Sequence, residues 1–421
     1  MPRATSHESP PALADVVERV VARTPAFDIH THLYAPHFGE LLLWGIDELL
    51  IYHYHVAEAF RFWPGPYAGF FALPKTRQAE MIWDELFIRR SPLSEACRGV
   101  LTTLNRLGLD VRSRDLPALR AHFAAQNAED HVETCLRTAN VSRACMTNSP
   151  FDLLETPRWN SFAGDERFPA ALRIDPLLND WPGAVETLRA QGYDVQTELS
   201  DATLREVRRF LRDWAGRMNA LYLMVSLPPE FAFPEPGVRA RLIEDAVLPV
   251  CRELNLPFAL MLGVRRAVNP QLELASDGVG RSDLGALQTL CARFPANKFL
   301  VTVLSRENGH ELCVLARKFR NLHLFGCWWF LNVPSLIEET TRMRLELLGL
   351  SFTPQHSDAR VLDQVIYKWE HTRAVSARVL TDKYLDLTRT GWVPSEADIE
   401  RDVAQLFGGA FETFLQAEFA E

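Results

Sequence analysis

The sequence is poor in the features that mark several protein classes. Its 421 residues include seven cysteines, an odd number without a C-x-x-C pair, so neither a disulfide framework nor a zinc ribbon is expected. Residues 1–10 are polar, and the longest apolar stretches are far shorter than the ~20 residues that span a bilayer. We therefore predict no signal peptide, no membrane span and a cytoplasmic location.

Positive charge is also scarce. Lysine and arginine total 45 against 54 aspartates and glutamates, which gives a net charge of −9. Nucleic acids and anionic membranes select positive surfaces, so neither is expected as a partner. An anionic small molecule remains compatible with this charge, because a few buried arginines can hold it.

Two common catalytic signatures are absent. The Gly278-Val279-Gly280 stretch lacks the strand context and the third glycine of a dinucleotide-binding loop, and no G-x-S-x-G sequence occurs. We therefore expect no nucleotide cofactor and no serine elbow of the α/β-hydrolase kind.

What the sequence does contain is an alternation of short apolar runs with helical patterns. Residues 26–33 predict a first strand, and seven later runs predict further strands at 143–147, 170–174, 222–226, 257–262, 298–303, 321–325 and 350–353. Eight alternating units favour a closed parallel barrel over a doubly wound sheet. The fold class predicted is α/β, as a distorted (β/α)8 TIM-like barrel.

The same pattern divides the chain into three parts. Residues 24–36 and 139–393 are predicted to form the metal-dependent barrel, residues 37–138 a helical insertion subdomain after the first strand, and residues 394–421 C-terminal packing helices. Functional residues of such barrels lie at the C-terminal ends of the strands. Polar residues at those positions are therefore the candidates for a site.

Three of these residues have the chemistry of metal ligands. His30 and His32 lie two apart on the first strand, so their side chains share one side, and neutral imidazoles suit a divalent transition metal. Asp358 follows the eighth predicted strand and would complete a three-ligand mononuclear site with an open position. The alternatives are two unrelated polar residues near a strand end, and an aspartate that caps the next helix.

Two arginines are candidates for binding an anion. Arg173 ends the third predicted strand among apolar neighbours, and Arg360 follows Asp358 by two residues. A guanidinium matches a carboxylate with two parallel hydrogen bonds, so a substrate carboxylate is one interpretation. Pairing of Arg173 with a protein acid such as Asp175 is the other.

Aromatic residues near the predicted mouth carry weaker signals. His53 and Tyr54 could close over the mouth and supply a hydrogen-bond donor and a proton shuttle, but their spacing alone favours ordinary helix packing. Trp328, Trp329 and Phe330 follow the seventh strand, where core packing is the usual role and stacking on a sugar the alternative.

Taken together, these stretches resemble the uronate isomerases, a branch of the amidohydrolase superfamily. The resemblance extends from Phe27 to about Arg378, in order and approximate spacing. The matching stretches are 27–33, 43–45, 53–54, 147–152, 172–175, 260–266, 325–330, 347–350 and 357–360. The double tryptophan followed by the S-D-x-R segment is the more specific part.

The resemblance implies that the chain interconverts an aldohexuronate and a ketohexuronate, such as D-glucuronate and D-fructuronate. It implies one divalent metal ion, with zinc favoured, held by His30, His32 and Asp358. Asp358 would remove the C2 proton of the open-chain sugar to give a cis-enediol, Tyr54 would carry a proton between the two oxygens, and His53 would hydrogen-bond nearby.

The resemblance also implies that Arg173 and Arg360 clamp the substrate carboxylate and that Trp329 contacts the sugar. One departure stands out, because Met261 occupies a position where the family has histidine in an L-H-x-G sequence. The substrate is expected to be a small hexuronate, and the oligomeric state stays open, with a homo-oligomer among the options.

Two other functions compete with the isomerase. One is a mononuclear metal-dependent hydrolase or lyase that acts on a carboxylated sugar or lactone; the other is a binding protein without turnover. Binuclear hydrolases of the superfamily carry a carboxylated lysine at the end of the fourth strand, and residues 222–230 contain no lysine. This absence favours the isomerase.

Overall fold

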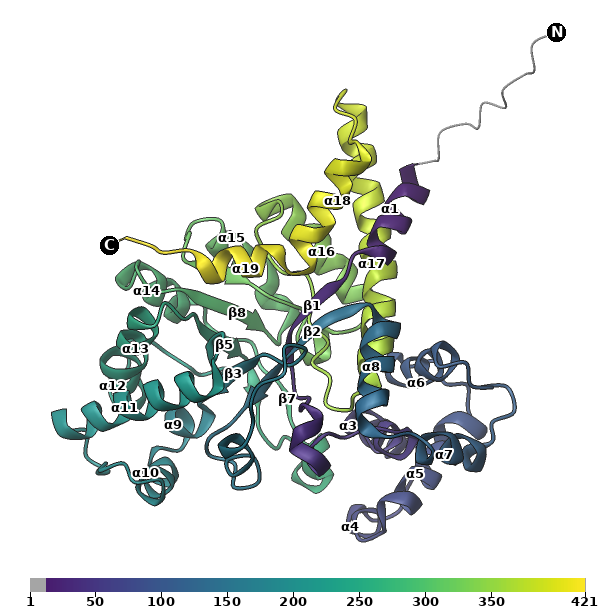
Figure 1. Ribbon diagram of the computed structural model, residues 1–421, viewed down its shortest axis with the longest axis horizontal. Coiled ribbons are helices and arrows are strands. Elements are labelled where there is room, and N and C mark those ends of the chain that lie inside the picture. The colour runs from purple at the N-terminus through teal and green to yellow at the C-terminus, as the bar shows by residue number, and fades with distance from the viewer. Residues whose placement is uncertain (1–12, 421) are drawn as a thin grey trace.

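Seven of the apolar runs form parallel strands in the computed structural model, which describes residues 13–420 (Figure 1). The polar segment 1–10, for which no signal peptide is predicted, lies outside the described residues. The strands are β1 (Ala26–Thr31), β2 (Val141–Asn148), β3 (Ala170–Arg173), β4 (Leu223–Leu227), β5 (Phe258–Leu262), β8 (Phe299–Val303) and β9 (Leu322–Leu324). Their order in the sheet, β1-β2-β3-β4-β5-β8-β9, follows the chain, and the sheet is curled.

The strands separate two apolar layers because successive side chains point to opposite faces. In β5, Phe258, Leu260 and Leu262 pack in the large core between the sheet and its helices. Ala259 and Met261 face a smaller cluster built from the neighbouring strands. Phe411 and Phe414 of α19 (Ala410–Gln416) belong to that smaller cluster.

The eighth predicted strand is absent, so the prediction of a strand over 350–353 is wrong. Only Thr353 makes a β-bridge there, to Phe325. Gly349 before the segment has a left-handed backbone with φ 62°, which breaks an extended run. Pro354 after it has no N–H to donate to a ladder, so the strand cannot continue.

The irregular segment 353–359 nevertheless contacts both edges of the sheet. The Thr353 N–H donates to the Leu324 carbonyl of β9 at 2.9 Å. The Asp358 N–H donates to the His30 carbonyl of β1 at 3.2 Å. The segment therefore lies between the two edge strands and carries Asp358 to the end of β1.

Every described element between β1 and β2 is helical. These elements are a 3-10 helix (Pro36–Leu41), α2 (Ile46–Leu50), α3 (His53–Ala59), α4 (Tyr67–Phe71), α5 (Lys75–Trp83), a π-helix (Asp84–Ile88), α6 (Glu95–Arg106), α7 (Leu116–Ala124) and α8 (Ala128–Ala139). Most of these helices pack around an apolar cluster of their own, to which Val361 is the one buried contributor from the rest of the described chain.

The helices that follow β3 cover the sheet and form the C-terminal part. They are α9 (Asp175–Asn179), α10 (Trp181–Ala190), α11 (Asp201–Met218), α12 (Val238–Leu242), a π-helix (Ile243–Val247), α13 (Leu248–Glu253), α14 (Gly285–Arg293), α15 (Gly309–Ala316), α16 (Pro334–Leu348), α17 (Gln364–Arg389), α18 (Glu396–Ala404), a π-helix (Gln405–Gly409) and α19. Short 3-10 helices cover Arg158–Asn160, Arg306–Asn308 and Trp329–Leu331. The helices predicted over the C-terminal residues are therefore present.

Helices α1 and α17 pack against each other. The first described helix is α1 (Leu13–Arg23), which buries Val17, Val20 and Val21. Helix α17 packs against α1, α6, α8 and α16, and Figure 1 shows it running along the edge of the sheet. None of the helices within residues 13–420 is long and apolar enough to cross a membrane.

A small hairpin was not foreseen from the sequence. The two-residue strands β6 (Val264–Arg265) and β7 (Gly278–Val279) pair antiparallel, with a 3-10 helix, Pro270–Ala275, between them. This loop directly follows β5, so it lies at the end of the sheet where the site residues gather.

Candidate functional site

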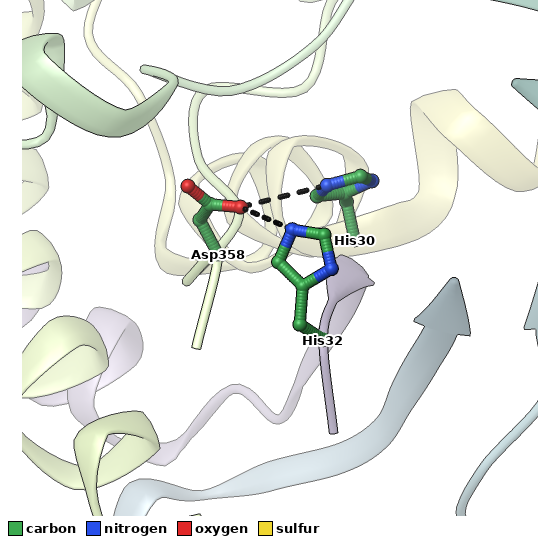
Figure 2. A group of neighbouring side chains, drawn as sticks. All are labelled: His30, His32 and Asp358. Atoms are coloured by element: carbon green, nitrogen blue, oxygen red, sulfur yellow. Dashed lines mark ion pairs between the residues drawn. The ribbon is translucent and has the colours of Figure 1, made fainter. Parts of the chain in front are cut away.

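His30 of β1, His32 directly after this strand and Asp358 of segment 353–359 meet at the carboxyl end of the sheet (Figure 2). Asp358 Oδ1 lies 3.5 Å from His30 Nε2 and 3.4 Å from His32 Nε2. His30 is fully buried, and the Asp358 side chain is 9% exposed. The structure thus brings together the three predicted metal ligands.

Neighbouring hydroxyl groups fix which ring nitrogen of each histidine carries the proton. Tyr222 donates its O–H to the Ile29 carbonyl at 2.8 Å, so it is left to accept from His30 Nδ1 at 3.4 Å. Thr147 donates to a carbonyl in the same way, at 2.8 Å, and lies 3.1 Å from His32 Nδ1. The Thr147 contact makes Nδ1 the protonated nitrogen of His32, so the Nε2 lone pair of that ring faces Asp358, and the longer Tyr222 contact favours the same tautomer of His30.

The charge states suit a cation. Burial lowers the pKa of His32 to about 4, so the ring is neutral near pH 7. Burial opposes the charged form of Asp358, but His30 and His32 outweigh it and hold the pKa of the carboxyl well below its usual range. His32 and Asp358 therefore have the protonation states in which an imidazole and a carboxylate bind metals.

The spacing fits a shared ion better than hydrogen bonds. Separations of 3.4 and 3.5 Å are too long for hydrogen bonds of normal strength. His30 Nε2 and Asp358 Oδ1 are buried and have no hydrogen-bond partner among the described residues. Ligands that each lie ~2.0–2.2 Å from one ion are separated by distances of this size, so these residues fit a divalent cation.

The segment that carries Asp358 is anchored by a second aspartate. Asp28 of β1 is fully buried and accepts hydrogen bonds from the Ser357 N–H and the Trp369 ring N–H, both at 2.9 Å. Asp358 itself has a left-handed backbone with φ 53°, a conformation that aspartate tolerates better than most residues. Asp28 thus holds the strained turn that aims Asp358 at His30.

Helix capping, the alternative role for Asp358, does not match the structure. Helix α17 begins six positions later, at Gln364, and the Gln364 side chain accepts from the backbone N–H groups of Arg360 and Val361. The capping interaction at this turn is therefore made by Gln364, while Asp358 is turned toward the histidines.

A cavity of about 320 Å³ opens beside this cluster. Seven of the residues singled out from the sequence line it: His32, His53, Arg173, Trp328, Trp329, Asp358 and Arg360. The loop between β6 and β7 adds Glu273 and Asp277 to the wall. A second cavity, of about 480 Å³, shares His32, Arg173 and Arg360 with the first. The two arginines therefore lie where the cavities meet.

The arginines differ in their partners. Arg173 makes two hydrogen bonds to Asp175, Nε to Oδ2 and Nη2 to Oδ1, both at 3.0 Å, which is the protein pairing considered from the sequence. The Arg360 guanidinium has no hydrogen bond or ion pair within residues 13–420. Arg360 thus has its full donor capacity available to an anion, whereas Arg173 keeps only part of it.

The aromatic candidates lie at different depths. His53 Nε2 and Trp329 Nε1 are buried, line the cavity and have no hydrogen-bond partner among the described residues. Burial lowers the pKa of His53 to about 3, with Arg360 acting in the same direction. Tyr54 does not line the cavity; its ring contacts those of Tyr52 and His53, and Tyr52 takes the wall position.

The two tryptophans both line the cavity and differ in how deeply they are buried. Trp328 is 4% exposed and belongs to the cluster inside the sheet, as the core interpretation expects. Trp329 stacks on Phe330 at 4.9 Å and has a left-handed backbone with φ 46°. Met261, which stands where the family has histidine, is 1% exposed and packs in the same inner cluster as Trp328.

A second group of potential metal ligands lies away from the cavity. His131 and Cys135 of α8 meet Asp363, which precedes α17, and all three are buried. Here His131 Nε2 and Asp363 Oδ1 are 2.6 Å apart, and the Gly45 N–H donates to Asp363 Oδ2 at 2.7 Å. This group is joined by ordinary hydrogen bonds.

Several residues around the site were missed from the sequence. Tyr222 and Thr147 orient the histidines, Asp28 anchors the Asp358 turn, and the charge of Asp358 favours the charged form of Lys368 on α17. Thr147 could have been found, because it ends a predicted strand next to β1. The others depend on contacts between segments far apart in the sequence, which no local pattern contains.

Comparison with solved structures identifies relatives of the whole chain; no protein-family model and no curated protein matches it. Two structures share the fold at low sequence identity. The uronate isomerase of Thermotoga maritima is 17% identical, with 96% of this chain and 97% of that chain covered and a TM-score of 0.77. The glucuronate isomerase of Caulobacter crescentus is 14% identical, with 97% of this chain and 95% of that chain covered and a TM-score of 0.75. The uronate isomerase of Bacillus halodurans C-125 is 52% identical over 98% of both chains, with a TM-score of 0.95. This chain therefore belongs to the uronate isomerase family.

Proposed function

We propose that the protein is an aldose–ketose isomerase that interconverts an aldohexuronate and a ketohexuronate, such as D-glucuronate and D-fructuronate. Membership of the uronate isomerase family supports the reaction. The observation that carries the proposal is a ligand cluster for a divalent cation on the same cavity as two arginines. A cation and guanidinium groups together match the carboxylate of a uronate.

The metal ion is proposed to be zinc, held by His30, His32 and Asp358. A set of two imidazoles and one carboxylate is typical of mononuclear zinc sites with an open position. When bound, the ion would supply positive charge that binds the oxygens of the substrate and stabilises negative charge that develops on them.

The chain's own residues account for the proton transfers. Arg360 and the free part of the Arg173 guanidinium hold the carboxylate, and Trp329 covers the sugar. Asp358 takes the proton from C2 of the open-chain aldose and returns it at C1, with a cis-enediol between the two steps. Tyr54, assisted by His53, carries a proton between the oxygens of C1 and C2. Tyr54 does not line the cavity, so this role requires the phenol to move toward the substrate.

The fold proposed for this function is a distorted (β/α)8 barrel. Segment 353–359 would take the place of the eighth strand, a view supported by its hydrogen bonds to β9 and β1. Residues 37–138 would form a helical insertion subdomain, as their separate apolar cluster suggests. We also propose a cytoplasmic location, supported by seven buried free cysteines, and no nucleic-acid or membrane partner.

The test is NMR of D-glucuronate and D-galacturonate incubated in deuterium oxide with the metal-loaded protein. Isomerisation through an enediol should yield the ketouronate with deuterium at C1. Turnover of a lactone or another carboxylated sugar without any isomerisation would instead support the hydrolase or lyase. Metal binding without turnover of any uronate would support a binding protein.

A further inference from the structure

Two of the protein's five lysines are buried, and their surroundings differ. Lys298, at the start of β8, is 3% exposed and donates to the Leu415 carbonyl at 2.5 Å. Lys368, on α17, is 5% exposed, and its ammonium has no hydrogen-bond acceptor and no ion-pair partner anywhere in residues 13–420. Burial lowers the pKa of both groups to about 8, so both are mostly charged at neutral pH.

Two aromatic rings lie next to the Lys368 ammonium. Its Nζ lies 5.6 Å from the ring centroid of Tyr54 and 5.3 Å from that of Tyr367. Asp358 is the acid that most favours its charged form, followed by Glu95 and Asp28, although none of the three pairs with it directly. Lys368 thus places a positive charge over the Tyr54 ring, within the electrostatic reach of Asp358.

This arrangement is costly for the fold. Burying an ammonium without an acceptor is unfavourable, and ring faces replace its lost hydration only in part. An apolar side chain of similar length, such as methionine, would fill the same space without that cost. Stability therefore does not account for a lysine here, in contrast to Lys298, whose hydrogen bond does.

We infer that Lys368 is a positioning residue for the isomerisation, which acts through Tyr54 by favouring the phenolate form that this tyrosine takes while it carries a proton. The inference rests on the proposed function. Burial raises the pKa of Tyr54 well above its ordinary value, and Tyr52 and Asp358 act in the same direction, so the phenolate needs a positive charge nearby. The Lys368 ammonium, 5.6 Å from the centroid of this ring, is a charge of that sign.

The proton transfers balance. When Asp358 takes the C2 proton, the C2–H electron pair forms the C1–C2 double bond, and the C1 carbonyl pair moves to O1, which receives the Tyr54 proton. The phenolate then takes the proton from O2. The O2–H electron pair forms the C2 carbonyl, the double-bond pair accepts the proton from Asp358 at C1, and Tyr54 is restored. Lys368 itself exchanges no proton.

Steady-state kinetics of Lys368→Met test this role, with Lys298→Met as the matched control. Lys368→Met should lower kcat about 10- to 100-fold, less than the ~10²–10⁴-fold lost with a general acid–base group itself, and change KM less than about threefold. Lys298→Met should leave kcat within about twofold, because that lysine lies at the opposite end of the strands. A Lys368→Met variant with kcat within twofold of the starting protein would overturn the inference.

A double-variant cycle with Tyr54→Phe tests the route. If Lys368 acts through Tyr54, Lys368→Met should change kcat less than about twofold once the phenol is gone, because coupled residues are not additive. Losses that multiply in the double variant would overturn the inference even if the single variant is slow. This comparison also holds if Lys368→Met alters stability.

Urea unfolding separates this inference from the proposed function. Lys368→Met should unfold at the same urea concentration as the starting protein or a higher one, whereas Lys298→Met should unfold at a lower one. If the starting protein turns over no uronate, the proposed function fails, and the role of Lys368 in the isomerisation fails with it. If the starting protein is active and the midpoint of Lys368→Met is lowered, the proposed function stands and the inference is overturned, because the lysine then stabilises the fold.

Discussion

The protein holds two buried clusters of similar composition, and their atoms are spaced differently. His30, His32 and Asp358 keep their nearest acid–imidazole distances at 3.4 and 3.5 Å, with acceptor atoms facing one another. His131 and Asp363 approach to 2.6 Å, with a proton between them. Residue types alone would class both clusters as metal sites, so spacing and protonation decide between them.

The surroundings of the two clusters agree with this division. The first lies on a cavity, and hydroxyl groups turn both Nε2 lone pairs toward the aspartate. In the second, both oxygens of Asp363 are already used, one by His131 and one by the Gly45 N–H. The second cluster ties α8, the turn before α2 and the start of α17 together, and so supports the part of the chain that carries His53 and Lys368.

Removing the two β1 histidines should have the largest effect. His30→Ala together with His32→Ala leaves one carboxylate, which cannot hold a mononuclear ion, so metal content should fall from about one ion per chain to a trace. Elemental analysis of protein purified without chelator measures this. The affinity for the metal ion should drop by more than the ~10–100-fold loss that is typical when a residue that only orients a metal ligand is removed.

The matched control is a change in the other cluster. His131→Ala should keep the full metal content, since that cluster is already satisfied by hydrogen bonds. Full metal retention in the double variant of His30 and His32 would remove these residues from the metal site.

Replacing the proposed base should have the next largest effect. Asp358→Asn keeps the size of the side chain but cannot accept the C2 proton, so turnover should fall ~10²–10⁴-fold. Deuterium incorporation from solvent should be lost in parallel. Metal content must be measured on the same sample, because a lost ligand would mimic a lost base. Near-normal turnover in a metal-replete variant would leave Tyr54 or His53 as the base.

The core of the site could be predicted from the sequence because it depends on local rules. Strand alternation places His30 and His32 on one side, and the end of a parallel strand is where ligands gather. Asp358 was identified from its place after the last strand, yet that strand does not form, since Gly349 and Pro354 break it. The position was predicted correctly because the irregular segment still pairs with β1 through Asp358.

The residues that support the site could not be predicted from the sequence. Asp28 shares a strand with the histidines, but its partners Ser357 and Trp369 are remote in the sequence. Lys368 is buried on its helix, and lysine is among the residues that are least often buried. The residue type therefore predicts an exposed position, which is wrong here. Contacts between distant segments decide these roles, and such contacts exist only in the folded chain.

The effect of the arginines should be smaller than that of the base. Arg173→Met should weaken uronate binding by ~2–5 kcal/mol, the range for truncating one partner of a buried charge pair. The variant should also discriminate less between a uronate and its neutral parent hexose. Calorimetric titration with both sugars measures this, and Asp175→Asn controls for the broken Arg173–Asp175 pair. Unchanged affinity and discrimination with an intact fold would make Arg173 a structural residue.

The smallest effect is expected in the second cluster, where it should appear in stability alone. His131→Ala removes the donor to Asp363 Oδ1 and leaves a buried acceptor unsatisfied, which should lower the free energy of unfolding by about 1–3 kcal/mol. His131→Gln keeps an N–H donor and should lose less. Urea unfolding measures both variants, and elemental analysis should find their metal content unchanged. If His131→Ala loses an ion while His30, His32 and Asp358 are intact, the second cluster binds metal, and short distances between its atoms do not distinguish the two clusters.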